Sequence, residues 1–166
     1  YNVMLKDDKT YPWIVIKHEP FPRVFWTRHY IKDGSKYFGP YASVGMMHVV
    51  LDTIRELFPL RTCALNLAQE NIAKGKYKTC LEFQIGNCKG PCEGLQTAQD
   101  YDQNLENIKD ILNGKISVVT NRIKEQLQQA ALQLNFEEAH LLKAKLDKLD
   151  NYQSKSTVVS SSISNV

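Results

Sequence analysis

The chain has 166 residues, of which 43% are hydrophobic, and a formal net charge of +3. This length allows one ordinary domain or two small ones, and the hydrophobic content is enough for a core. No stretch approaches the ~20 consecutive apolar residues that a helix needs to cross a bilayer, so we expect no transmembrane helix and no membrane among the partners.

Charge is distributed unevenly along the chain. Residues 1–92 hold 13 Lys and Arg against 8 Asp and Glu, whereas residues 93–166 hold 8 against 10. The division suggests that the first half faces nucleic acid and the second faces protein. The N-terminus has neither an initiator Met nor the apolar region of a signal peptide, and residues 155–162 resemble the start of a linker. We therefore expect a cytoplasmic piece of a longer protein.

Residues 11–41 are predicted to form a small antiparallel β-meander. Two runs of β-branched and aromatic residues, 13–16 and 24–27, are bounded by prolines, which cannot donate to a β-ladder. The second connection contains Asp33-Gly34, a favoured two-residue hairpin turn.

A helix is predicted over residues 43–58, with Ser43 as its N-cap and Pro59 as its stop. Its apolar positions recur at intervals of three and four, which indicates one buried face. Those positions are Val44, Met47, Val50, Leu51, Ile54 and Leu57. Residues 64–78 are polar and lysine-rich and are predicted to be a surface excursion, followed by one helical turn at 81–85.

Three more helices are predicted in the acidic half. The first begins after Thr97, which is its cap, and ends at Asn113-Gly114. The second spans about 116–134, with Leu134 as its last apolar position, and the third begins at Phe136. The last two have coiled-coil-like spacing and a short connection, so they form an antiparallel hairpin. A hairpin of this size cannot bury enough surface to be stable alone, and it packs either on the rest of the chain or on a partner.

The four cysteines of the chain follow the spacing Cys-x16-Cys-x7-Cys-x3-Cys. They are Cys63, Cys80, Cys88 and Cys92. In the cytosol such a group more often binds metal than forms disulfides. The spacing lacks the paired knuckles of a zinc ribbon, and four irregularly spaced thiolates fit an iron–sulfur cluster at least as well. A cluster, zinc, and unligated thiols packed as small apolar groups all remain open.

Basic residues of the first half are interleaved with aromatic residues. Side chains of these two kinds suit weak, salt-sensitive, sequence-independent DNA binding, through phosphate contacts and base stacking. They also suit a small sheet whose aromatic residues form the core and whose lysines are solvated. The candidate DNA contacts are Lys6, Lys9, Lys17, Arg23, Arg28, Lys32 and Lys36.

Several segments resemble, in the same order, those of the UvrC family, an excinuclease subunit of bacterial nucleotide excision repair. Residues 1–9 resemble the end of its GIY-YIG nuclease domain, and residues 134–139 resemble its UVR motif. The other matching segments are 36–41, 57–63, 80–92 and 156–159.

The resemblance implies an α+β fold with five parts. Residues 1–10 are the remnant of the GIY-YIG domain, and 11–95 form a β-meander, helix and cysteine-rich domain. Residues 96–114 form a connecting helix. Residues 115–152 form the UVR hairpin, and 153–166 form a linker toward an RNase H-like domain.

The resemblance also implies a function. UvrC proteins cut damaged double-stranded DNA on both sides of a lesion, in a system linked to the SOS response. No Gly-Ile-Tyr or Tyr-Ile-Gly tripeptide occurs here, so we expect a non-catalytic segment that spaces two nuclease domains. The four cysteines match the ligands of a [4Fe–4S] cluster, with zinc or no metal as the alternative in a purified sample. A different class of function is an independent metal or redox module with a helical oligomerisation hairpin.

In this family the UVR motif pairs with a C-terminal helical hairpin of UvrB. The expected contacts here are Phe136, Glu137, Ala139, Leu142 and Leu146. The motif departs from the family pattern at Lys143 and Ala144, where an Arg and an acid are usual, so no bidentate charge pair forms there. Docking therefore depends more on apolar side chains. Self-association through the hairpin is a further option.

Overall fold

The computed structural model describes residues 11–164, with side chains described for residues 11–154. Over this range the fold is α+β, as expected, with a three-stranded antiparallel sheet and six α-helices. The chain divides into two compact units between Glu106 and Asn107. The predicted GIY-YIG remnant, including Lys6 and Lys9, lies outside the described residues.

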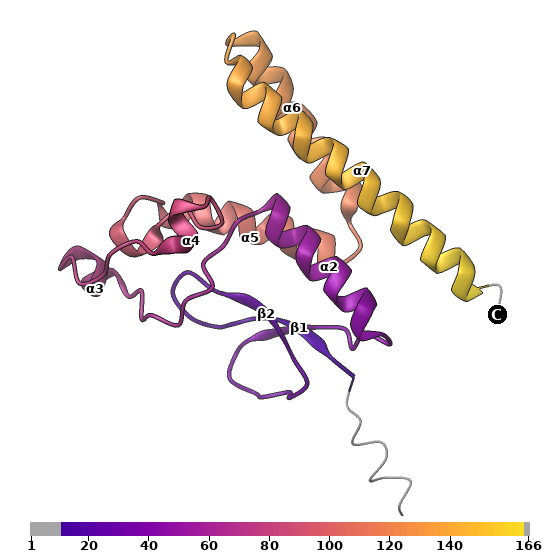
Figure 1. Cartoon of the computed structure of the whole chain (residues 1–166), viewed down its shortest axis with the longest axis horizontal. Coiled ribbons are helices and arrows are strands. Elements are labelled where there is room, and N and C mark those ends of the chain that lie inside the picture. Colours follow the sequence, from indigo (N-terminus) through magenta and orange to yellow (C-terminus); the bar gives the residue numbers. More distant parts are fainter. Residues whose placement is uncertain (1–10, 165–166) are drawn as a thin grey trace, which may run out of the picture. The chain divides into compact units, whose positions relative to one another are not determined.

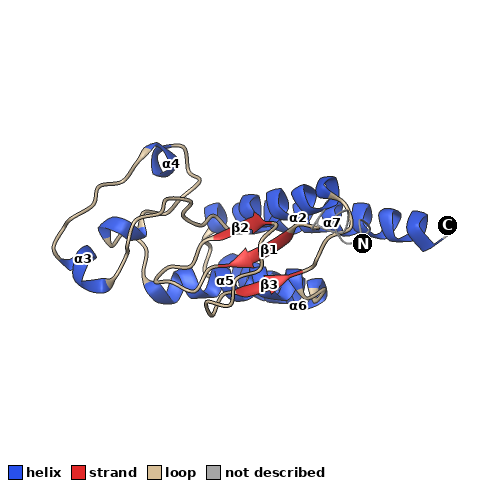
Figure 2. Ribbon diagram, turned by 90° about the horizontal axis from the view of Figure 1, so that it is seen from below, coloured by secondary structure: helices blue, strands red, loops and turns tan. Residues whose placement is uncertain are grey.

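The first unit begins with strands β1 (Trp13–Ile16), β2 (Val24–Thr27) and β3 (Lys36–Phe38). The first two lie at the predicted positions. The strand order is β2-β1-β3, with β1 antiparallel to both neighbours, as Figure 2 shows. The prediction of a β-meander is therefore wrong in its connectivity, because a meander would place β2 in the centre.

Side-chain contacts around Asp33 explain why no hairpin joins β2 to β3. The Asp33 carboxylate accepts hydrogen bonds from the Ser35 backbone N–H and from Lys17 Nζ, just beyond β1. The Ser35 hydroxyl accepts from the His18 backbone N–H at 3.0 Å. These bonds fasten residues 33–35 to the end of β1, so the chain crosses to the far edge of the sheet. Asp33-Gly34 forms a bend in this crossing, with Gly34 at φ 89°.

Helix α2 (Val44–Leu57) covers part of the sheet and lies against β1 (Figure 1). Ser43 caps it as predicted, because its hydroxyl accepts from the Met46 backbone N–H at 3.2 Å. Five of the six predicted apolar positions are buried. Val44 is the exception at 37% exposed, since the first turn projects past the core.

Between α2 and the next long helix lie three short elements: α3 (Gln69–Ala73), α4 (Leu81–Gln84) and a 3-10 turn, η1 (Pro91–Glu93). The helical turn at α4 was predicted. Helix α3 was not, because its N-cap residue Ala68 offers no side-chain acceptor. The predicted surface excursion thus contains regular structure, and its Leu67 is buried.

Helix α5 (Ala98–Leu112) spans the boundary between the two units. The Thr97 hydroxyl caps it, accepting from the Asp100 backbone N–H at 3.1 Å. Within the first unit, Tyr101 is fully buried and its hydroxyl donates to the Pro22 carbonyl at 2.7 Å. The ring of Phe21 packs edge-on against Tyr101, with centroids 5.1 Å apart. These contacts attach the proline-rich loop after β1 to α5.

The second unit consists of α6 (Ile116–Leu132) and α7 (Phe136–Ser164), together with the end of α5. The two helices lie side by side as an antiparallel hairpin (Figure 1). Helix α6 ends two residues earlier than predicted, because Leu134 adopts φ 59° in the turn. Leu134 is consequently 71% exposed, although we expected it on the apolar face. Buried residues of the hairpin are Val119, Ile123, Ala130, Leu142, Leu146 and Leu149.

Helix α7 continues through residues 153–164, for which the sequence predicts a linker. A helix can also space two domains, so the helical structure of this segment does not contradict a linker. The predicted boundary at residue 153 stays a prediction. Within the second unit the Arg122 guanidinium binds the Asp110 carboxylate at 3.0 Å and the Asn107 side chain, joining α6 to the end of α5. In the described part of the chain, no helix has the length and apolar character to cross a membrane.

Candidate functional site

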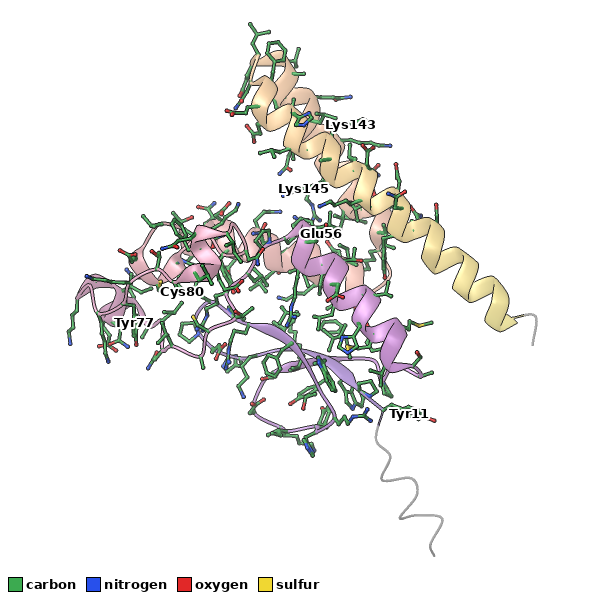
Figure 3. The ribbon with its side chains drawn as sticks, viewed as in Figure 1. Tyr11, Glu56, Tyr77, Cys80, Lys143 and Lys145 are labelled. Atoms are coloured by element: carbon green, nitrogen blue, oxygen red, sulfur yellow. The ribbon has the colours of Figure 1, made fainter. Side chains whose placement is uncertain are left out.

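The four cysteines lie in the irregular region between α2 and α5. Cys63 is half-buried, and Cys80 is the exposed N-cap residue of α4, labelled in Figure 3. Cys88 is half-buried in the loop after α4, and Cys92 is buried within η1. No cysteine is in a long helix or a strand, so their positions depend on loop contacts.

Two sets of hydrogen bonds bring the cysteine-bearing segments together. The Tyr77 hydroxyl and the Asn71 side-chain amide both donate to the Asn66 carbonyl, at 2.9 and 3.0 Å. They close the excursion between Cys63 and Cys80 at its base. The Thr79 backbone N–H donates to the Glu93 carboxylate at 2.6 Å, which ties the residue before Cys80 to the residue after Cys92.

A left-handed turn at Gly90 shapes the loop between Cys88 and Cys92. Gly90 has φ 72°, which favours glycine, and an added Cβ would lie 3.0 Å from the Phe83 ring. Its backbone N–H points at Cys88 Sγ, 3.5 Å away. The turn therefore places a backbone donor beside a sulfur, as in sites that stabilise thiolates.

Electrostatic interactions connect all four thiols. Burial raises the pKa of Cys88, and the charges of Cys63 and Cys80 raise it further, whereas the Gly90 N–H lowers it. Burial likewise raises the pKa of Cys92, with Cys63 and Cys88 adding to the effect. Thiolates that repel one another in this way are stabilised by a shared cation, because a thiol that coordinates a metal ion loses its proton.

The donor set suits a metal, but the side-chain positions do not form a ligand cage. Within the described side chains, no group of three or more His, Cys, Asp or Glu residues is arranged to hold a metal ion. Four cysteine thiols are nevertheless the donor set that structural zinc and [4Fe–4S] clusters use. The residues fit such a group by chemistry, and ligation stays a prediction.

Arg61 is the main residue of this region that sequence reasoning missed. Its side chain is buried and donates to four backbone carbonyls: Pro20 at 2.8 Å, Phe21 at 2.7 Å, Cys63 at 3.0 Å and Leu65 at 2.6 Å. The signal available in the sequence is an arginine two residues before a cysteine, in a run of apolar residues. An arginine among apolar residues is fully buried only when its charged group has partners, so this one was a candidate for a structural role.

The candidate DNA-binding residues do not form a uniform group. Lys17 is engaged with Asp33, and Arg23 binds Glu19 with Nε 2.7 Å from the carboxylate. The Lys17 side-chain hydrogen bond is the main cause that holds the pKa of Asp33 well below its usual range. Arg28, Lys32 and Lys36 are exposed, and the Arg28 guanidinium lies over the Trp26 ring. Among the candidates that the structure describes, the exposed cations are therefore those from the end of β2 to the start of β3.

Some of the predicted partner-binding residues are buried in the hairpin, and the others lie on its surface. Leu142 and Leu146 are buried, and Ala139 is half-buried. Phe136 is 68% exposed at the start of α7, and Glu137 is exposed beside it. The turn also exposes Leu132 and Leu134. Three of the exposed large apolar side chains of the hairpin thus gather at its turn, whereas Leu142 and Leu146 belong to the interior.

Comparisons with known proteins identify the class. Residues 11–111 match the family described as UvrC/Cho excinuclease, middle domain. The sheet, α2, all four cysteines and nearly all of α5 fall inside this match. The first unit therefore belongs to the middle domains of excinucleases.

The relatives extend this result to the whole chain. It is 51% identical over 166 residues to the UvrABC system protein C of Flavobacterium johnsoniae, covering 100% of this chain and 28% of that protein. It is 52% identical to the UvrABC system protein C of Christiangramia forsetii, covering 100% of this chain and 28% of that protein. It is 51% identical to the UvrABC system protein C of Bacteroides thetaiotaomicron, covering 100% of this chain and 27% of that protein. The chain belongs to the UvrC family. It spans little more than a quarter of the length of these relatives, and no solved structure matches it.

Proposed function

We propose that the chain is the non-catalytic central segment of a UvrC subunit of the nucleotide excision repair excinuclease, which cuts DNA on both sides of a lesion. The observation that carries this proposal is the match of the entire chain to UvrABC system protein C from several bacteria. In this function the segment spaces two nuclease domains, holds a cysteine-ligated cofactor, and recruits UvrB. Contact with damaged DNA is weak and independent of sequence.

Recruitment of UvrB is assigned to the hairpin turn. Support comes from the exposure of Phe136, Leu132 and Leu134, because large apolar side chains gathered at one exposed place mark an interaction surface. Aromatic anchors dominate the energetics of such surfaces. Leu142 and Leu146 contribute by keeping the two helices together.

A pull-down with the C-terminal hairpin of UvrB tests this assignment. Phe136→Ala should weaken binding by about 2 kcal/mol or more, as loss of an aromatic anchor does. Val118→Ala is the matched control, since Val118 is also an exposed apolar residue but lies near the start of α6. Binding that both changes leave intact would favour the alternative, an independent metal or redox module whose hairpin serves oligomerisation.

The cofactor is assigned to Cys63, Cys80, Cys88 and Cys92. Support comes from the mutual electrostatic interactions of the thiols and from the Gly90 N–H beside Cys88. When bound, a [4Fe–4S] cluster or zinc would tie the loop after α2 to the segment around η1. Metal analysis and a visible absorption spectrum on anaerobically purified protein test the assignment. Metal-free protein under these conditions would contradict it.

DNA contact is assigned to the exposed cations between β2 and β3. Fluorescence anisotropy with duplex and bubble DNA at low salt should detect binding that Lys32→Ala/Lys36→Ala weakens. For each lysine that binds a phosphate, its removal should reduce the slope of log affinity against log salt by about one unit. Lys74→Ala/Lys76→Ala removes the same charge from the excursion around α3 and is the control. Equal effects of the two double variants would mean that only net charge matters.

A further inference from the structure

Arg61 joins two loops that are far apart in sequence. Its guanidinium donates to Pro20 and Phe21 in the loop after β1, and to Cys63 and Leu65 in its own segment. The planar fork of arginine makes several such bonds at once, which a lysine cannot do. The backbone on both sides of Cys63 therefore has its position set by a residue outside the four-cysteine pattern.

One of these partners is held in a strained conformation. Phe21 has φ 52°, in the left-handed region that is unfavourable for a non-glycine residue. The guanidinium binds its carbonyl at 2.7 Å, and its ring packs on Tyr101. Strain of this kind persists where surrounding contacts fix it, and it is found preferentially at functional sites. The contacts of Arg61 and Tyr101 with Phe21 therefore hold this loop in a conformation that it would not adopt alone.

The charges around Arg61 leave a positive surplus beside Cys63. Glu19 is 3.2 Å from the Arg61 guanidinium and also accepts two hydrogen bonds from the Arg23 guanidinium. A single carboxylate thus faces two guanidinium groups. Arg61 Nη1 lies 4.0 Å from Cys63 Sγ, the outer limit for an N–H···S contact, and Arg23 interacts electrostatically with the same thiol. A buried positive surplus stabilises an anionic neighbour.

We propose that Arg61 is a positioning residue of the cysteine site: its guanidinium fixes the backbone at Cys63 and, together with Arg23, supplies positive charge to a sulfur-ligated anionic group. This inference rests on the proposed cofactor. Hydrogen bonds and charges near ligand sulfurs set the potential and retention of iron–sulfur clusters, so Arg61 acts on both. Glu19 limits the effect by neutralising part of the charge.

The experiment uses anaerobically reconstituted chain and two substitutions with opposite consequences. Arg61→Gln removes the positive charge and should make the reduction potential more negative, with about tenfold faster loss of iron to a chelator. Glu19→Gln removes the opposing carboxylate and should make the potential less negative. Arg55→Gln is the control, because Arg55 is an arginine with one backbone partner, Val24, in a different part of the unit. It should leave the potential unchanged.

A merely structural role for Arg61 would lower stability without shifting the potential in opposite directions. If Arg61→Gln does not fold, as judged by circular dichroism, Arg23→Gln and Glu19→Gln make the same test, because Arg23→Gln removes the second positive charge beside Glu19 without touching the backbone hydrogen bonds of Arg61. If the chain retains zinc, affinity in chelator competition replaces the potential, with the same opposite directions expected. Wild-type protein that binds neither metal overturns the proposed cofactor itself. A wild-type cluster whose potential both substitutions leave unchanged overturns the role of Arg61 alone.

Discussion

The two units of the chain are stabilised in different ways. In the first unit, side chains reach across long sequence separations to backbone carbonyls: Arg61 to Phe21, and Tyr101 to Pro22. In the second unit, repeating apolar residues of α6 and α7 are buried along a hairpin, and Arg122 adds a local polar connection to α5. The first arrangement builds a specific loop geometry, whereas the second builds a regular shape with an exposed turn.

This difference determines what each unit tolerates. A buried donor or acceptor that loses its partner costs the full desolvation of that group, about 1–3 kcal/mol. A substitution at an exposed position on a regular helix usually changes the free energy of unfolding by less than about 0.5 kcal/mol. Substitutions at polar residues should therefore be much more harmful in the first unit than in the second, and apolar truncations should be harmful in both.

Truncation of a buried leucine in either unit should have the largest effect. Leu51→Ala in α2 and Leu149→Ala in α7 each remove a side chain that is at most 1% exposed. Each should lower the free energy of unfolding by about 2–5 kcal/mol, through reduced burial and the remaining cavity. Hydrogen exchange should show reduced protection mainly in the unit that carries the change. Loss of protection to the same extent in both units would remove the distinction between them.

Tyr101→Phe tests the polar contacts of the first unit. The change leaves the Pro22 carbonyl without its donor and should cost about 1–3 kcal/mol. Burial raises the pKa of Tyr101 above its ordinary value, because it disfavours the phenolate. The folded state therefore retains a proton that the unfolded chain releases above pH ~10, and stability falls as pH rises past that value. Urea unfolding between neutral and alkaline pH should show this decline in the wild type and a smaller one in Tyr101→Phe. Identical pH profiles would contradict it.

The helix caps allow a matched comparison of smaller size. Ser43 caps α2, and the Asn135 side chain accepts from the Glu138 backbone N–H at 3.3 Å at the start of α7. Replacing either residue with Ala should cost about 1 kcal/mol, measured by thermal or urea unfolding. Ser117→Ala, inside the first turn of α6, is the control and should change stability by less than about 0.5 kcal/mol. A cost confined to Ser43 would mean that α7 does not need its cap.

The smallest effect is expected for an exposed ion pair of the second unit. Lys143 and Asp147 lie 3.6 Å apart, with both side chains more than half exposed. Such a pair contributes less than about 0.5 kcal/mol, and the order Lys before Asp is the weaker one on a helix. Lys143→Ala should therefore leave the unfolding midpoint almost unchanged at physiological salt. A large loss of stability would show that Lys143 has a partner beyond this carboxylate.

Regular elements were predictable from the sequence, and the contacts between loops were not. Periodicity and caps located α2 and the starts of α5 and α7, because those signals are local. Asp33-Gly34 was misassigned because it has the composition of a hairpin turn, while its connection is decided by Lys17 and His18, far earlier in the chain. The four cysteines were identified as a group from spacing and family resemblance. Arg61 was not, since two of its four carbonyl partners, Pro20 and Phe21, come close to it only after folding.

The place of β1 between its two neighbours has a practical consequence for anyone shortening the protein from its N-terminus. Residues 13–16 supply both ladders of the sheet, so a truncation past Ile16 deprives Val24–Thr27 and Lys36–Phe38 of their shared partner in one step. A fragment that starts after this strand would expose two unpaired edges, which invites aggregation. Fragments intended for crystallisation or reconstitution should accordingly begin upstream of Trp13.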